Sequence, residues 1–176
     1  MTSKEQIAKW AAEATLEYLE KQRLKETKSR ADRRLRNTRL LLRNYHLLKA
    51  HCERSVYSIS QSTERPIDIL DDIDALDRST YIDAIKRSRT RTQIIINHID
   101  TMMDLYRAYC EKSDKPEDFR RYRILKAVYF DQYTIPAVCE MENIDISTYY
   151  RDNRDSIEKL SALIFGIDGL STVRKT

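Results

Sequence analysis

Chain-breaking residues are almost absent from this sequence, which holds only two glycines and three prolines among 176 residues. Strands joined by tight turns need glycine and proline to adopt the backbone angles of those turns, so a β-rich architecture has too little turn chemistry here. A 41% share of hydrophobic residues is nevertheless enough to bury a core. The composition therefore predicts an all-α fold.

Long apolar runs and paired cysteines are also missing. No segment approaches the roughly 20 apolar residues of a membrane-spanning helix, and the start MTSKEQIAKW lacks the apolar core of a secretory signal. We therefore expect a cytoplasmic protein that does not bind membranes. Cys52, Cys110 and Cys139 fit no CxxC pattern, which indicates reduced thiols packed as small hydrophobic side chains.

Catalytic and metal-binding motifs are not found either. The sequence has no glycine-rich phosphate loop and no GxSxG elbow, so it does not predict an enzyme. A tyrosine or serine recombinase could use Ser147, Tyr149 or Tyr150 as its nucleophile. No histidine follows position 98, so the His/Arg site of a tyrosine recombinase is not expected. His46 and His51 point to different sides of a helix, so neither a metal site nor another cofactor is expected.

What the sequence does have is charge and helical periodicity. Basic residues exceed acidic ones by 32 to 28, a mild excess that selects no function by itself. Apolar positions over 24–52 alternate by four and three residues, and a helical period over 7–18 precedes them. One long helix is therefore expected over about 4–59.

Basic residues crowd that helix, at Arg33, Arg34, Arg36, Arg39 and Arg43. Such a run can lie along a phosphate backbone and supply salt-dependent affinity. A solvated face of a coiled coil is the more frequent role, and we favour it for this run.

An acidic connector, residues 60–77, follows the first helix. Pro66 and its polar neighbours end the helix, and five aspartates give the connector its charge: Asp68, Asp71, Asp72, Asp74 and Asp77. A second heptad run over 82–110 predicts another helix over about 78–112. These helices form a platform, residues 1–113, and can pair as a hairpin within one chain or as a coiled coil across a dimer.

Shorter helices are expected in a compact C-terminal domain, residues 114–176. Thr134 is a candidate N-cap with Pro136 in the first turn of its helix, and Asn143 is suited to the left-handed conformation that ends the helix. Asp145 then caps a second helix, which Gly166 ends in a Schellman-like stop with Ile167 behind it. Two hydrophobic staples support the pair, Tyr133 with Val138 and Ile144 with Tyr149.

The second of these helices has the pattern of a recognition helix. Its expected buried side comprises Tyr149, Asn153, Ser156 or Ile157, Leu160 and Leu163. Hydroxyls and arginines at its exposed start can donate to phosphates and to guanine, although the arginines could equally pair with Asp152, Asp155 or Glu158. The candidate DNA-binding residues are Thr134, Ser147, Thr148, Tyr150, Arg151 and Arg154.

The segment NIDISTYYRDNRDSIEKLSALIFGI resembles the C-terminal signature of the ArpU- and RinA-like phage late-gene transcription regulators, which is similar to the helix-turn-helix of sigma-factor region four. The resemblance covers about 119–167. It places Asn143 where glycine is usual and Asp145 where a capping serine is usual. Glu142 stands where a buried leucine is usual, and Met141 could take that place after a small shift in the turn.

The resemblance implies a sequence-specific transcription regulator that activates phage or prophage late genes, with double-stranded DNA and RNA polymerase as partners. We expect a homodimer, because two-fold symmetry lets two weak reading heads share a divided site. The acidic connector would suit a basic protein partner better than DNA, or serve only as a solvated loop. The alternative function is a helical protein-interaction scaffold, or a phage assembly or packaging adaptor, without specific DNA binding.

Overall fold

A computed structural model of the chain describes residues 3–53 and 64–166, and every regular element in these ranges is an α-helix. The all-α prediction is therefore confirmed. None of the helices in this part of the chain is long and apolar enough to span a membrane. The helices are, in order, α1 (Ser3–Arg43), α2 (Tyr45–Glu53), α3 (Pro66–Ile73), α4 (Arg78–Lys86), α5 (Arg89–Lys112), α6 (Pro116–Tyr129), α7 (Ile135–Glu142) and α8 (Ile146–Phe165).

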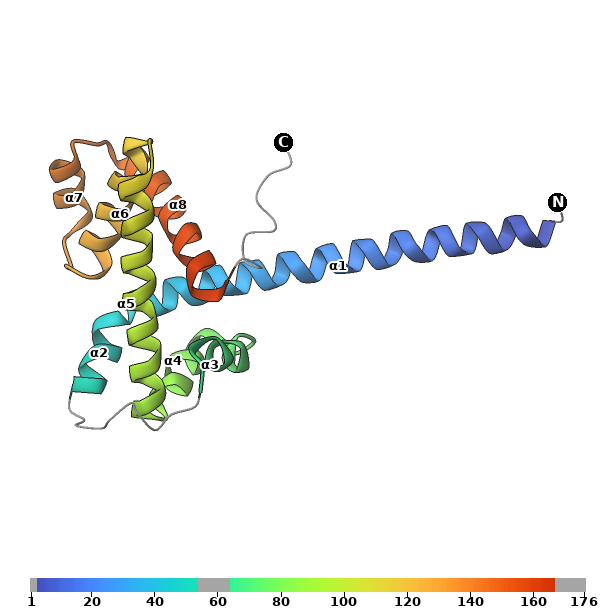
Figure 1. The fold of residues 1–176 in the computed structure, drawn as a ribbon, viewed down its shortest axis with the longest axis horizontal. Coiled ribbons are helices and arrows are strands. Elements are labelled where there is room, and N and C mark those ends of the chain that lie inside the picture. Colours follow the sequence, from blue (N-terminus) through green and yellow to red (C-terminus); the bar gives the residue numbers. More distant parts are fainter. Residues whose placement is uncertain (1–2, 54–63, 167–176) are drawn as a thin grey trace.

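The molecule is a helical bundle from which a long rod extends. Figure 1 shows the N-terminal part of α1 reaching away from all other described helices, while its C-terminal part enters the bundle. From Gln6 to Arg30 the side chains are exposed, apart from the half-buried Gln22 and Thr27. Burial begins at Ala31, where α1 meets α8 and α4.

The single helix expected over 4–59 is interrupted at Asn44, so that prediction is wrong in its extent. The Asn44 side-chain amide donates to the Leu40 carbonyl at 2.8 Å, a local bond that competes with the helical ladder. In Figure 1, α2 leaves the line of α1 at this point, and the change of direction lets α2 pack along α5. Residues 54–59 lie outside the described part.

The helix expected over 78–112 is likewise two helices, α4 and α5. Ser88 separates them as the N-cap of α5, and its hydroxyl accepts a hydrogen bond from the Arg91 backbone N–H at 3.4 Å. The connector expected over 60–77 also holds a helix of its own, α3. Pro66 is the first residue of that helix. Proline is tolerated there because backbone N–H groups in the first turn have no partner within the helix, so its missing N–H costs little.

One hydrophobic core joins the two regions on either side of residue 114. It includes Leu41 and Leu48 of the first heptad run, Ile99 of the second, and Leu160 and Ile164 of α8, each at most 1% exposed. Within the described part of the chain, only the last part of the first heptad run packs along the second, through α2 and α5. α8 packs against α1, α5 and α6, so its position is fixed by both regions.

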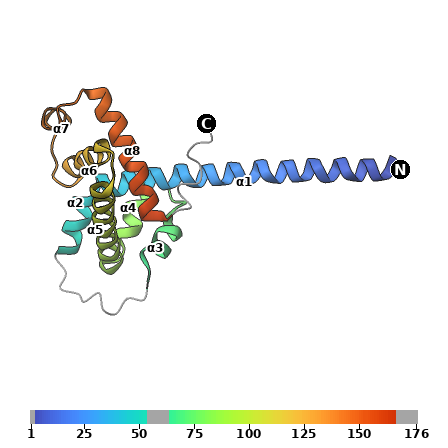
Figure 2. The ribbon, with the colours of Figure 1, turned by 45° about the horizontal axis from the view of Figure 1, so that its top comes forward.

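Figure 2 gives the orientation of α8 in this core. In both views its C-terminal end meets α1, whereas its N-terminal end and α7 lie away from α1. α8 ends at Phe165, followed by Gly166 with φ 83° and ψ 173°. The positive φ fits the expected glycine stop, but this ψ is not the left-handed value of a Schellman motif, and Ile167 lies outside the described residues.

The cysteines occupy packed positions, as predicted. Cys52 and Cys110 are buried and Cys139 is half-buried. Burial raises the pKa of the Cys110 thiol to about 11, so this side chain is a neutral thiol at physiological pH.

Candidate nucleic-acid interface

α7 and α8 form a helix-turn-helix whose turn is centred on Asn143. This residue has φ 50° and ψ 53°, the left-handed conformation predicted for it. The Ile144 backbone N–H donates to the Cys139 carbonyl at 3.0 Å, which closes the end of α7. Pro136 lies in the first turn of α7, also as predicted.

Asp145 caps α8 with an unusually complete set of hydrogen bonds. Its carboxylate accepts from the backbone N–H groups of Ser147 and Thr148 at 2.8 and 2.9 Å, and from both of their hydroxyls. The hydrogen bond from the Ser147 hydroxyl, with those from Thr148, holds the pKa of Asp145 well below its ordinary value. The protons of both hydroxyls are therefore used in hydrogen bonds to Asp145. Toward a ligand, these hydroxyl oxygens can act only as hydrogen-bond acceptors.

The two predicted staples differ in outcome. Ile144, Val138 and Tyr149 belong to one small cluster with Ile124 of α6, and Val138 and Tyr149 are at most 2% exposed. Tyr133 is 49% exposed and lies outside that cluster, so it does not staple the start of α7. The sequence alone cannot reveal this difference, because both pairs have the same spacing.

One face of α8 is exposed near its start. Ser147, Tyr150, Arg151 and Arg154 are exposed there, and Thr148 is half-buried at the flank. The opposite face is buried, as predicted, at Tyr149, Ser156, Ile157 and Leu160, with Asn153 and Leu163 half-buried. Thr134 is exposed at the N-cap of α7, where its side chain makes no capping hydrogen bond.

Ile146 is a surface residue that the sequence pattern did not single out. It is 52% exposed and lies one turn before Tyr150, which is 59% exposed. Apolar side chains at the start of a recognition helix can contact thymine methyl groups. Its place directly after the cap, in phase with Tyr150, was the signal that could have identified it.

Arginines of α6 bind the aspartates of α8. Arg151 and Arg154 of α8 therefore have no ion-pair partner closer than 3.5 Å within the described ranges. The Asp152 side chain is fully buried and lies 2.7 Å from Arg120, measured from Nη2 to Oδ2. Arg121 lies 3.0 Å from Asp155. By contrast, the shortest ion-pair distances of Arg151 and Arg154, to these same two aspartates, are 3.8 and 3.5 Å, and both arginine side chains are 58% exposed.

Glu142 faces inward, and Met141 does not replace it. Arg123 of α6 donates to the Glu142 carboxylate at 2.7 Å from Nε and 2.5 Å from Nη2, and its guanidinium lies 5.1 Å from the ring centre of Phe119. Met141 is 61% exposed, so the shifted register suggested for it is wrong. An ion pair beside an aromatic ring therefore occupies this position between α6 and α7.

Three arginines in the basic stretch of α1 have neither of the roles expected for them, which were a solvated coiled-coil face and a row that binds phosphates. Arg33 Nε lies 3.1 Å from Asp74, Arg34 Nη2 lies 3.3 Å from Asp71, and Arg36 donates to the Leu76 carbonyl at 2.8 Å. These side chains fasten α1 to the end of α3 and to the loop that follows. They form neither a solvated coiled-coil face nor a free phosphate-binding row.

The same contacts engage the acidic connector. Besides Asp71 and Asp74, Asp68 pairs with Arg65 at 2.8 Å and Asp77 caps α4. The fifth aspartate, Asp72, is exposed. Four of the five carboxylates therefore have partners inside the chain, although only Asp74 is buried.

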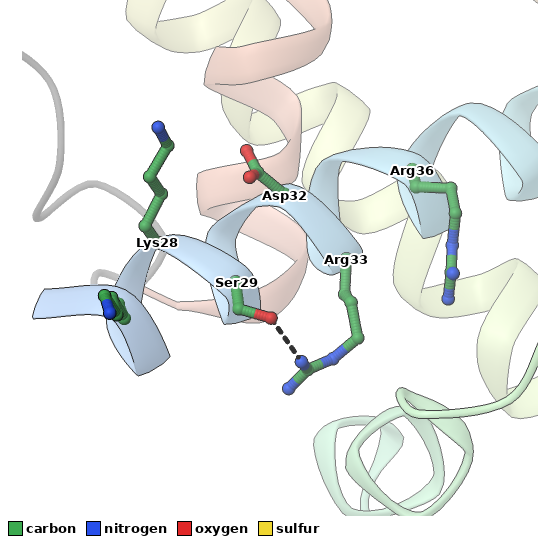
Figure 3. A pocket seen from close by; sticks show the side chains of 6 residues that line it. Lys28, Ser29, Asp32, Arg33 and Arg36 are labelled. Carbon is green, nitrogen blue, oxygen red and sulfur yellow. Dashed lines mark hydrogen bonds between the residues drawn. The ribbon is translucent and has the colours of Figure 1, made fainter. Parts of the chain in front are cut away.

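A shallow hollow of about 400 Å³ runs along α1 beside this contact. It is lined by Lys25, Lys28, Ser29, Asp32, Arg33 and Arg36. Figure 3 shows that Arg33 turns back to Ser29, at 2.9 Å, whereas Lys28 points to the other side of the helix. Because these cations diverge, the hollow does not form a converging anion site.

No metal-binding cluster of three or more His, Cys, Asp or Glu side chains occurs within the part of the chain that the structure describes. Comparisons of the whole chain with family models, with curated proteins and with solved structures found no significant match.

Proposed function

We propose that this protein is a sequence-specific, double-stranded DNA-binding regulator of transcription with α8 as its recognition helix. The observation that supports this most strongly is the exposure of Arg151 and Arg154 on one face of α8 while its inward aspartates are bonded from α6. An arginine at the start of a recognition helix can donate two hydrogen bonds to guanine O6 and N7 in the major groove. Ser147 and Tyr150 add hydrogen-bonding and stacking groups to the same face.

The two helix starts would divide the work of binding. α8 begins with an anionic cap at Asp145, which repels phosphate and suits a position facing base edges. α7 begins at Thr134 without a side-chain cap, so the N–H groups of its first turn can donate to a DNA phosphate. In this arrangement α7 positions the protein on the backbone and α8 reads the sequence.

The test is selection from random duplex oligonucleotides with the full-length protein, followed by affinity measurements at about 0.15 M salt, where specific binding usually survives. A selected site is expected, and its affinity should fall when Ser147, Thr148, Arg151 and Arg154 are all changed to alanine. Unchanged affinity in that folded variant would exclude α8 as the recognition helix.

The full chain is required for these measurements. A fragment beginning at Pro116 would expose Leu160 and Ile164, which are buried in the core that α8 shares with α1 and α5. Loss of binding by such a fragment would report unfolding and say nothing of the interface.

The direction of regulation follows from the resemblance alone. We propose activation of phage or prophage late genes in the cytoplasm, by a homodimer that holds RNA polymerase at a promoter. The acidic connector is not assigned as the polymerase contact, because four of its carboxylates are engaged within the chain. In a purified transcription assay the protein should raise output from its selected site; lowered output would make it a repressor.

A protein-interaction scaffold or phage packaging adaptor is the second candidate function. The observation in its favour is the exposed N-terminal part of α1, whose apolar side chains include Ile7, Trp10 and Tyr18. This candidate predicts that the full-length protein retains no duplex DNA at about 0.15 M salt. The same selection experiment therefore separates the two functions.

A further inference from the structure

The stem, which we define as residues 6–30 of α1, lies outside the core. Its length is roughly 38 Å at the α-helical rise per residue. Ile7 is 59% exposed, Trp10 66%, Tyr18 61% and Leu24 66%, and no other described helix runs beside this part of α1 in Figure 1 or Figure 2. Most of the stability of helices in proteins comes from packing of one face, so contact with another surface would stabilise the stem.

The apolar side chains of the stem form a stripe. Ile7, Ala11, Ala14 and Tyr18 follow the spacing of four and three residues that places side chains on one face. Ile7 and Ala14 also begin a seven-residue series that reaches Leu42 in the core. The stem therefore carries the pattern of a helix that packs against another helix.

The same face changes character halfway along the stem. After Tyr18 the stripe continues as Lys21, Lys25 and Lys28. The aliphatic part of a lysine side chain can cover apolar surface while its ammonium group reaches outward. Residues 11–20 carry three glutamates and no basic residue, whereas residues 21–30 carry five basic residues and one glutamate. The two halves of one stem are therefore complementary to each other in charge.

We propose that the stem binds the stem of a second copy of this chain in antiparallel orientation. Residues 11–20 of each copy then lie against residues 21–30 of the other. The aliphatic parts of the lysine side chains cover Ala14 and Tyr18, and their ammonium groups face the acidic half that holds Glu13, Glu17 and Glu20. Within one copy, Lys21 already pairs with Glu17 at 2.6 Å. A parallel pair would place acid against acid and base against base. A two-fold axis between residues 20 and 21 makes the contact self-complementary and closed.

This pairing gives the homodimer of the proposed function a surface and an orientation. It does not depend on DNA, since the stem and the exposed start of α8 lie on different parts of the molecule. Failure of the pairing would leave DNA reading by a single chain in place, and failure of DNA binding would leave the dimer in place. The two proposals are therefore tested separately.

The first experiment uses the full-length protein without DNA. Sedimentation from about 1 to about 100 µM should show a dimer that dissociates on dilution, within the range of weak protein association. A monomer at all these concentrations would overturn the proposal.

The second experiment compares two equally exposed positions. Tyr18 lies on the stripe, and Leu16 lies about 200° away around the helix; they are 61% and 62% exposed. Because neither side chain is part of the core, Tyr18→Lys and Leu16→Lys should both fold. Tyr18→Lys should raise the dimer dissociation constant by roughly tenfold or more, since it places a cation against the lysines of the partner copy, and Leu16→Lys should leave it nearly unchanged. Equal effects of the two substitutions would exclude the stripe as the contact.

Salt tests the orientation. Raising NaCl from about 0.05 M to about 0.5 M screens the attraction between opposite charges, so an antiparallel dimer should dissociate more readily. A parallel dimer would be relieved of repulsion and should tighten. Tightening with salt would therefore overturn the antiparallel arrangement.

Discussion

Arginines of α1 and of α8 contrast in how far they are available to a ligand. Arg33 and Arg34 of α1 pair with aspartates of the connector at 3.1 and 3.3 Å, whereas Arg151 and Arg154 of α8 remain 58% exposed beside aspartates that other arginines hold. Both helices carry arginines beside or near carboxylates, so their sequences alone do not separate the two cases. The difference lies in the neighbouring helices: α3 brings carboxylates to α1, and α6 brings guanidinium groups to the carboxylates of α8.

The contrast extends to burial. Arg34 is only 6% exposed, its guanidinium lies 5.5 Å from the ring centre of Phe165, and its Nε and Nη1 have no hydrogen-bond partner among the described residues. Its partner Asp71 is 55% exposed, so this ion pair lies at the edge of the contact between α1 and α3. The arginines of α1 thus define how the platform is assembled, and those of α8 are left for recognition.

Removal of the Asp152 carboxylate should have the largest effect. Asp152→Ala leaves Arg120 and Arg121 without their shared buried acceptor, so the free energy of unfolding should fall by about 3 kcal/mol. Urea denaturation of the full-length protein measures this. Asp155→Ala is the control, because Asp155 is 28% exposed and its loss should cost about 1 kcal/mol. Equal losses of unfolding free energy in the two variants would mean that the burial of Asp152 does not determine its contribution to stability.

The next largest effect should be on DNA. Arg151→Ala is expected to weaken binding to the selected site by about 1 to 3 kcal/mol if Arg151 contacts a base. A phosphate contact would instead weaken all sequences alike. Arg107→Ala, on α5, is a matched control because the Arg107 side chain is also 58% exposed. Equal losses of DNA affinity in the two variants would mean that the effect comes from the net charge of the protein and not from a contact made by Arg151.

The helix caps offer a smaller, pH-dependent effect that both regions should share. Hydrogen bonds from Ser79 and then Thr80 lower the pKa of Asp77 to about 2, and Asp145 has the same arrangement at the start of α8. A carboxylate with a lowered pKa stabilises the folded state above its ordinary pKa, and this stability is lost as pH falls from about 4 to about 2.

Asparagine retains an acceptor but does not titrate, so Asp77→Asn and Asp145→Asn should each flatten the dependence of unfolding free energy on pH over that range. Urea denaturation at a series of pH values provides the measurement. If the unfolding free energy of a variant depends on pH as steeply as that of the wild-type protein, the cap does not contribute to this pH dependence.

The smallest effect is expected for Arg33→Ala. Its ion pair with Asp74 is partly exposed, so the loss of stability should be below about 1 kcal/mol. DNA affinity should not change, because this arginine serves the contact between α1 and the end of α3. A loss of affinity comparable to that of Arg151→Ala would show that α1 also touches DNA.

The features that could be predicted from sequence are those decided by neighbouring residues. The left-handed Asn143, the Asp145 cap and the position of Pro136 depend on side chains within a few residues of each other. The exposed face of α8 followed from helical periodicity in the same way. Such local chemistry needs no knowledge of the remaining fold.

The features that were missed join distant parts of the chain. The pair of Arg123 with Glu142 spans 19 residues, and that of Arg33 with Asp74 spans 41. Many carboxylates could have satisfied each arginine, and only the packed structure selects one. The interruption at Asn44 has a similar origin, since it lets α2 follow α5 rather than continue α1.

The direct packing of α8 on the C-terminal part of α1 has a mechanical consequence. Phe165, at the end of α8, lies against Arg34, and the two helices share one core without an intervening linker. The N-terminal part of α1 is then a lever arm of roughly 38 Å whose fulcrum is this contact. A rigid tilt of α1 would rotate α8 with it or break the core, which couples the direction of α8 to whatever holds the N-terminal part of α1.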